Sequence, residues 1–140
     1  MTARQTKIEP FPVLRASIWL GVAVAAPLAV VVVVLGAVAA WDQAAVAMGM
    51  AGLGLLAAIA GQAPVYWLSG RSIEGAGLGF VMGAMARVGL TLAMTVVFAR
   101  WAGYPLEVTL GWGVAWYVWL LGVEVLLLTR YLRTRGVTWR

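Results

Sequence analysis

Residues 75–98 read GAGLGFVMGAMARVGLTLAMTVVF, an apolar stretch with a single charge near its centre, Arg87. At about 1.5 Å per residue, such a segment is long enough to cross a hydrocarbon core of about 30 Å as a helix. A permanent cation at mid-depth in a bilayer is costly, so it needs a partner or an aqueous cavity. The stretch therefore predicts a membrane-spanning helix, and Arg87 is the first candidate functional residue.

The composition places the whole chain in the same class. Hydrophobic residues make up 64% of the 140 residues and charged residues 11%, which leaves too little polar surface for a soluble globule. The chain has no Cys and no His. It therefore lacks disulfides, the usual ligands of zinc, haem and iron-sulfur clusters, and the base of a nucleophilic triad. We expect an integral membrane protein that is not an enzyme and has no metal or cofactor.

Four apolar segments follow one another and are predicted to be helices. They cover residues 17–40, 44–68, 75–98 and 106–128, between a basic arm at 1–15 and a tail at 129–140. The short polar breaks between the segments allow only antiparallel neighbours. We therefore expect one all-α transmembrane domain, a four-helix bundle of two antiparallel helical hairpins.

Basic residues are concentrated on one side of this predicted bundle. The arm, the second loop and the tail carry eight Lys or Arg residues, whereas the opposite side has only Arg100. This asymmetry predicts that both termini face the cytoplasm. Arg130, Arg133 and Arg135 are expected to serve as a topology signal and to bind anionic lipids, which makes a nucleic-acid site unnecessary to explain them. A cleaved signal peptide is disfavoured because the first apolar run exceeds the core of about 7 to 15 residues typical of such signals.

Three glycines precede Arg87 on one face of the third segment. Gly75, Gly79, Gly83 and Arg87 recur every four residues, and glycines so spaced permit another helix to approach closely. Two occupants of this groove are open at this point. It receives either the second segment, itself rich in small residues, or another protein, in which case these four residues form a partner-binding site.

Glu124 is the only acid in the interior of a predicted apolar segment and is the internal candidate to pair with Arg87. Counted from the predicted cytoplasmic ends, the two residues differ in depth by roughly 10 Å. The alternatives for Arg87 are a stretched pair with Glu124, a partner in another chain, or a water-lined cavity. Gln62, Tyr66 and Tyr117 are predicted to lie near Glu124, and the group forms either a structural polar clasp or a proton-handling site.

Three tryptophans mark one face of the fourth segment. Trp112, Trp116 and Trp119 follow one another at spacings of four and three residues, which places them together on a helix. This stripe is predicted to pack against helices or lipid, with a docking face for a partner helix as the alternative.

Three stretches of the chain resemble a known family. They are APVYW at 63–67, GAMAR at 83–87 and LGVEVLLLTR at 121–130. Together they resemble ATP synthase subunit I, the small four-helix accessory chain of bacterial ATP synthases. This chain departs from the family at Val65, where the family commonly has Asn after the proline.

The resemblance implies a non-enzymatic accessory or assembly subunit of a rotary ATP synthase in the bacterial inner membrane. It implies that the partner is the rotor c subunit, whose mid-membrane carboxylate would complement Arg87. A role in supplying a cation to the synthase is also implied. The residues themselves leave two alternatives open, a small ion or proton transporter or channel subunit and a structural subunit of another membrane complex. Self-association into a homo-oligomer is open as well.

Overall fold

The structure consists of helices joined by short turns. The computed structural model describes residues 11–134, apart from the side chain of Ile73. Its helices are α1 (Val13–Ala37), α2 (Trp41–Ala60), α3 (Gln62–Ser69), α4 (Ile73–Ala102) and α5 (Leu106–Thr134). With α2 and α3 taken together, four helical segments are long and apolar enough to cross a membrane. The prediction of an all-α chain with four apolar spans is confirmed for the described residues, and the four segments indicate a multi-pass membrane protein.

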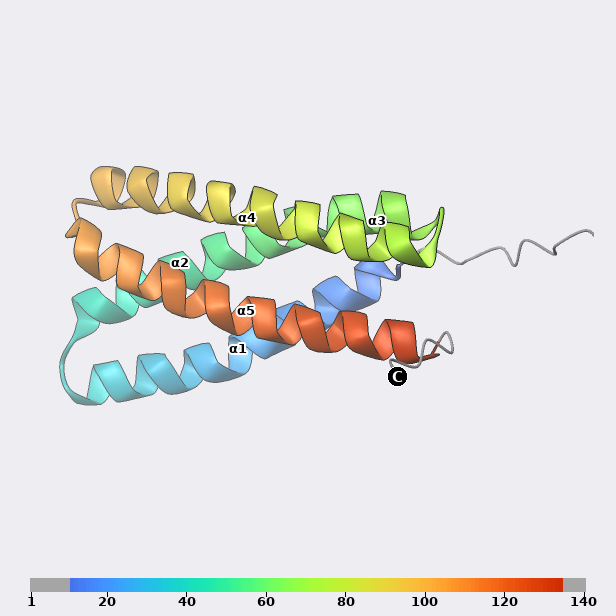
Figure 1. Cartoon of the computed structure of the whole chain (residues 1–140). Coiled ribbons are helices and arrows are strands. Elements are labelled where there is room, and N and C mark those ends of the chain that lie inside the picture. Colours follow the sequence, from blue (N-terminus) through green and yellow to red (C-terminus); the bar gives the residue numbers. More distant parts are fainter. Residues whose placement is uncertain (1–10, 135–140) are drawn as a thin grey trace, which may run out of the picture.

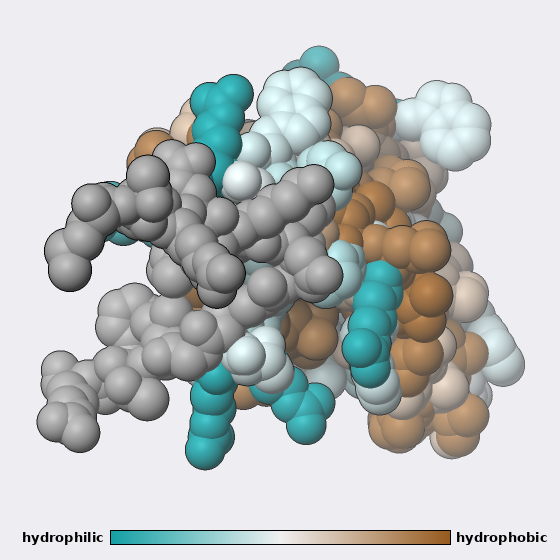
Figure 2. Space-filling view, turned by 90° about the vertical axis from the view of Figure 1, so that its right-hand side faces the viewer, coloured by the Kyte–Doolittle hydropathy of each residue, from teal (hydrophilic) through white to brown (hydrophobic). Residues whose placement is uncertain are grey.

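The long helices run back and forth along a common direction (Figure 1). α1 and α2 run in opposite directions, as do α4 and α5, and α3 packs along the first half of α4. The start of α1, the turn at 70–72 and the end of α5 lie at the same end of the molecule, which we call the terminal end. Figure 2 looks onto this end and shows hydrophilic side chains next to a hydrophobic flank.

The first turn lies earlier in the chain than the polar residues predict. α1 ends at Ala37, not at residue 40, and Ala39 takes a left-handed conformation with φ of 57°. Trp41 then begins α2, and Asp42 lies in its first turn, where a carboxylate is stabilised by the positive end of the helix dipole. The second helix therefore starts three residues before its predicted position.

The second predicted helix is interrupted at Gly61. Pro64 explains the position of the break, because its ring has no N–H to donate to the carbonyl of Ala60 and also clashes with that carbonyl. α2 ends at Ala60 and α3 begins at Gln62. The predicted single helix over 44–68 is therefore two helices that share one path across the bundle.

The remaining helices are longer than their apolar stretches. Ser72 caps α4 by accepting a hydrogen bond from the backbone N–H of Gly75 at 2.9 Å. Gly103 ends α4 in the left-handed conformation, with φ of 74°. α5 continues past residue 128 to Thr134, so Arg130 and Arg133 are exposed helical residues and not part of an extended tail. Arg135 lies outside the described residues, as do the first ten residues of the predicted arm.

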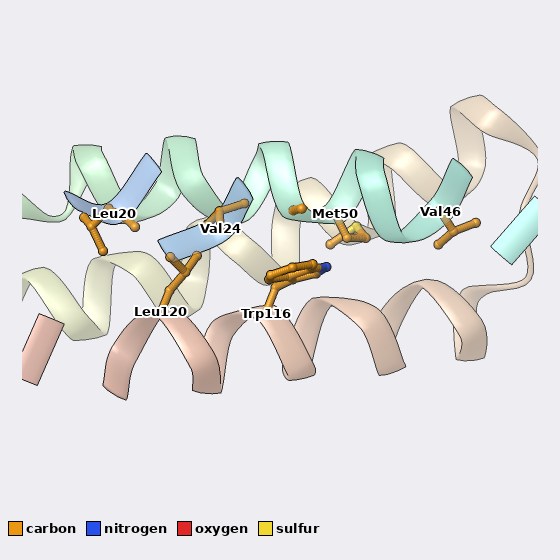
Figure 3. Packing of buried hydrophobic residues seen from close by; sticks show 8 residues of the cluster. Leu20, Val24, Val46, Met50, Trp116 and Leu120 are labelled. Carbon is orange, nitrogen blue, oxygen red and sulfur yellow. The ribbon is translucent and has the colours of Figure 1, made fainter. Parts of the chain in front are cut away.

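The main core lies where α1, α2 and α5 meet (Figure 3). It contains, among others, Leu20 and Val24 of α1, Val46 and Met50 of α2, and Trp116 and Leu120 of α5. Two tryptophans of the predicted stripe also donate hydrogen bonds between helices. The indole N–H of Trp116 donates to the carbonyl of Ala47 at 3.1 Å, and that of Trp119 donates to Ala23 at 2.9 Å. The stripe thus holds α5 against α2 and α1.

We expect Trp116→Phe to lower the free energy of unfolding by about 0.5 to 1.5 kcal/mol, because the substitution removes the hydrogen bond to Ala47 from an apolar interior. Reversible unfolding in mixed detergent micelles measures the change. Trp101→Phe is the matched control, since Trp101 is 87% exposed, and it should leave the stability unchanged. Equal effects of the two substitutions would contradict the packing of α5 on α2.

Candidate functional site: a buried ion pair

Arg87 and Glu124 form an ion pair in the interior of the bundle. The Nη1 group of Arg87 donates to Oε2 of Glu124, and the two side chains are 2% and 6% exposed. Within residues 11–134 it is the one ion pair of the structure. Of the alternatives left open for Arg87, the structure has the partner in the same chain.

The actual helix lengths explain why the two residues meet. Arg87 lies fifteen residues before Ala102, the end of α4, and Glu124 lies eighteen residues after Leu106, the start of α5. These two ends are joined by a short turn, so the residues differ in depth by only about 4.5 Å. The larger mismatch predicted from the sequence was wrong because it assumed that α5 ends at residue 128.

Arg87 belongs to a narrow buried stripe that runs the length of α4. Its members recur every three or four residues and are Ala76, Gly79, Gly83, Arg87, Thr91, Thr95 and Ala99. The spacing keeps one face of α4 against the rest of the bundle. Glu124 continues the corresponding stripe of α5, one helical turn after Leu120, so the two stripes face the same interior.

The glycine groove of α4 is filled by α3. A Cβ atom on Gly79 would lie 2.6 Å from the carbonyl oxygen of Pro64 and 2.8 Å from Cα of Val65. Cβ atoms on Gly75 and Gly83 would overlap the carbonyl oxygens of Leu68 and Gly61. The second segment of the same chain therefore occupies the groove. In this structure, the prediction that Gly75, Gly79 and Gly83 receive another protein is corrected, because α3 leaves no space for one.

Gly61 makes room for the guanidinium of Arg87. A Cβ atom at this position would lie 2.7 Å from Nη2 and 2.9 Å from Nε of Arg87. The break between α2 and α3 thus coincides with the place where the cation is buried. This role of Gly61 was not predicted from the sequence, although a glycine three residues before a proline in an apolar span is a usable signal for such a break.

The ion pair does not use all the hydrogen-bonding groups of its two side chains. Nε of Arg87 and Oε1 of Glu124 are buried and have no hydrogen-bond partner among the described residues. A bidentate ion pair would use two guanidinium nitrogens of Arg87 and both carboxylate oxygens of Glu124, as arginine and carboxylate pairs often do. Each side chain therefore keeps one unused polar atom in a low-dielectric interior, where such atoms are costly.

A small cavity adjoins the pair. Its volume is about 20 Å³, and its lining includes Arg87, Glu124 and Gln62. This is enough space for about one water molecule. Gln62 is 4% exposed, and its Oε1 accepts a hydrogen bond from the hydroxyl of Ser17 at 3.4 Å. Gln62 and Glu124 thus line the same cavity, and the hydrogen bond between Gln62 and Ser17 was not predicted from the sequence.

The two tyrosines of the predicted group lie elsewhere. Tyr66 is 45% exposed and borders a surface hollow with Trp67 and Arg71. Tyr117 lines a separate apolar groove between α4 and α5. Neither of them lines the cavity of the ion pair. The side-chain hydrogen bonds here join Arg87 to Glu124 and Ser17 to Gln62, and Gln62 is the polar residue that lines the cavity beside the ion pair.

The described residues offer no evident metal centre. Within 11–134, no group of three or more acidic side chains lies close enough together to hold a metal ion.

No protein family model, curated protein or solved structure matches this chain. The site itself is a buried cation and carboxylate, Arg87 of α4 and Glu124 of α5.

Proposed function

We propose that this chain is a non-enzymatic accessory subunit of a rotary ATP synthase, and that Arg87 binds the mid-membrane carboxylate of a c subunit. The observation that carries the proposal is the incomplete pairing of Arg87, whose Nε has no partner among the described residues. An arginine has five N–H donors in a planar fork and can serve a second carboxylate. Arg87 also lies at the middle of α4, fourteen residues after Ile73, which suits a partner group at mid-membrane depth.

The route to Arg87 in this proposal is the groove between α4 and α5. Its volume is about 110 Å³, and its lining includes Thr91, Leu92, Val114 and Tyr117. Leu92 and Val114 are 50% and 57% exposed, so the groove is open on the side that faces lipid. Thr91 lies one helical turn from Arg87, about 6 Å along the axis. An apolar helix of a c subunit lying here brings its carboxylate towards the guanidinium, where it competes with Glu124 for the donors of Arg87.

The proposed setting is the bacterial inner membrane with the terminal end in the cytoplasm. The excess of basic residues in the arm, second loop and tail supports this orientation. The resemblance of 63–67, 83–87 and 121–130 to the accessory subunit supports the choice of complex. Transport by this chain alone has less support, because the cavity at the ion pair has room for about one water and the groove beyond it is lined mainly by apolar residues.

Affinity purification tests the proposal. The tagged chain is extracted in mild detergent from cells that express a complete rotary ATP synthase, and the co-purified c subunit is quantified. We expect wild type to recover c subunit and Glu124→Gln to recover more, because a neutral amide competes less for Arg87. The double variant Arg87→Met/Glu124→Leu should lose recovery by more than about tenfold, since it lacks the cation.

The double variant separates binding from folding, because replacing a buried ion pair by apolar residues usually preserves stability. If it folds and still recovers the c subunit, Arg87 is only an internal clasp. Val114→Trp and Val118→Trp form a second matched pair, since both valines are exposed on α5 and only Val114 lines the groove. We expect only Val114→Trp to lower recovery. Recovery of a different membrane complex by wild type would favour the structural-subunit alternative.

A further inference from the structure

The terminal end contains a second cavity, with a basic rim, between the start of α1 and the end of α5. Its volume is about 370 Å³. Two arginines from different helices line it, Arg15 of α1 and Arg130 of α5, and both side chains are exposed. From the sequence, Arg130 was expected to bind anionic lipids together with Arg133 and Arg135 as part of a basic tail, and Arg15 was assigned to no site.

The walls of this cavity are fixed by contacts between α1 and α5. The rings of Phe11 and Tyr131 meet edge to face, with centroids 5.3 Å apart. Phe11 is in turn held at the end of α3, where its backbone N–H donates to the hydroxyl of Ser69 at 3.0 Å. The two arginines are therefore carried by helices whose relative position is set by packing.

Within residues 11–134, no acidic side chain pairs with either arginine. Neither Arg15 nor Arg130 has an ion-pair or hydrogen-bond partner in the part of the chain that the structure describes. Among the described residues that line the cavity, none is acidic. Two cations bordering one hollow repel each other, and an anion placed between them removes this repulsion and gains a charge-assisted hydrogen bond from each guanidinium.

The rest of the lining suits the remainder of a phospholipid. Ala16 and Leu127 provide apolar surface, and Trp19 is 51% exposed one turn further along α1. Tryptophan at such a position is typical of the boundary between headgroups and acyl chains. The start of α1 adds to the attraction for an anion, because no side chain caps it and the positive end of the helix dipole lies there.

We propose that this cavity is a binding site for one anionic phospholipid, whose phosphate lies between Arg15 and Arg130 and whose glycerol and upper acyl chain contact Ala16, Trp19 and Leu127. The site differs from a diffuse attraction of basic residues to the membrane surface. It requires one arginine from each of two helices, and an arginine that does not line the cavity takes no part in it.

Native mass spectrometry of the purified full-length chain in detergent tests the proposal. The probes are phosphatidylglycerol and phosphatidylcholine with identical acyl chains. Wild type is expected to retain one phosphatidylglycerol in preference to phosphatidylcholine. Arg15→Gln and Arg130→Gln should each weaken phosphatidylglycerol binding about fivefold, the effect of one basic residue near an anionic lipid surface.

Arg133→Gln is the matched control. Arg133 is exposed on the same last turns of α5 but does not line the cavity, so its loss should change binding little. All three altered side chains are exposed, and circular dichroism checks that each variant folds. Equal weakening by the three substitutions, or equal binding of the two lipids, would overturn the site. Displacement of the lipid by millimolar inorganic phosphate would instead identify free phosphate as the ligand and would also overturn it.

Discussion

Arg87→Met alone is expected to lower the free energy of unfolding by about 3 to 5 kcal/mol, the largest effect of any substitution considered. Removal of one member of a buried ion pair leaves the other without compensation in a low-dielectric interior. Glu124 is 6% exposed and its Oε1 already lacks a partner, so it has no alternative contact to compensate for the lost cation. Reversible unfolding of the chain in mixed micelles gives the difference from wild type.

The double variant Arg87→Met/Glu124→Leu is the control for this prediction. Replacing both members by apolar residues of similar size is often neutral or stabilising, so we expect its stability to lie within about 1 kcal/mol of wild type. A double variant as unstable as the single variant would mean that the ion pair stabilises the fold in a way that apolar side chains of similar size cannot replace. A single variant as stable as wild type would mean that Arg87 and Glu124 do not meet in the folded chain.

Gly83→Ala is expected to lower the free energy of unfolding by about 1 to 3 kcal/mol or more. The added methyl group would overlap the backbone oxygen of Gly61, and a backbone atom cannot rotate away as a side chain does. α3 and α4 must therefore separate, which is the general cost of overpacking a close contact. The separation also disturbs the guanidinium of Arg87, which packs against Gly61.

Gly89→Ala on the same helix is the matched substitution. A Cβ atom at Gly89 meets nothing within 4 Å. Since alanine favours a helix over glycine by about 1 kcal/mol, Gly89→Ala should be neutral or slightly stabilising under the same assay. Should the two glycine variants prove equally stable, α3 does not lie against Gly83, and the groove is again available to another protein.

The four apolar spans were predictable because the bilayer imposes a simple rule. A segment that crosses hydrocarbon must satisfy its own backbone hydrogen bonds, and a run of about 20 apolar residues does so as a helix. This rule concerns the hydrocarbon core only. It does not say where a helix ends in the headgroup region, so the helical turns of 129–134 and the helical start at Trp41 were missed.

The position of the helix ends decided whether Arg87 and Glu124 could be paired from the sequence. Both residues were identified as the charges within apolar spans. Their relative depth was misjudged because α5 extends six residues beyond its apolar run to Thr134. Counting from the turn between Gly103 and Pro105, whose glycine and proline are strong signals, gives the better depth for both residues.

Depth alone also does not specify a helix face, which explains why Tyr66 was misplaced. Gln62, Val65 and Ser69 form the buried side of α3, and Tyr66 follows Val65 by one residue, about 100° further around the axis. It therefore points away from the interior. Tyr117 was misplaced for a different reason. It shares a face with Glu124 but lies two turns away along α5, where it lines a groove with Thr91 and not the cavity beside Arg87.

The most direct test of the account is a solid-state NMR measurement of the contact between Arg87 and Glu124 in lipid bilayers. Two samples are compared. In the first, every chain carries both ¹⁵N-arginine and ¹³C-glutamate. The second is a mixture of chains that carry only ¹⁵N-arginine and chains that carry only ¹³C-glutamate. The account predicts a guanidinium-to-carboxylate contact in doubly labelled wild type that disappears in Glu124→Gln and is absent from the mixture. A contact in the mixture, or none in the doubly labelled chain, would contradict the pairing of Arg87 with Glu124 of its own chain.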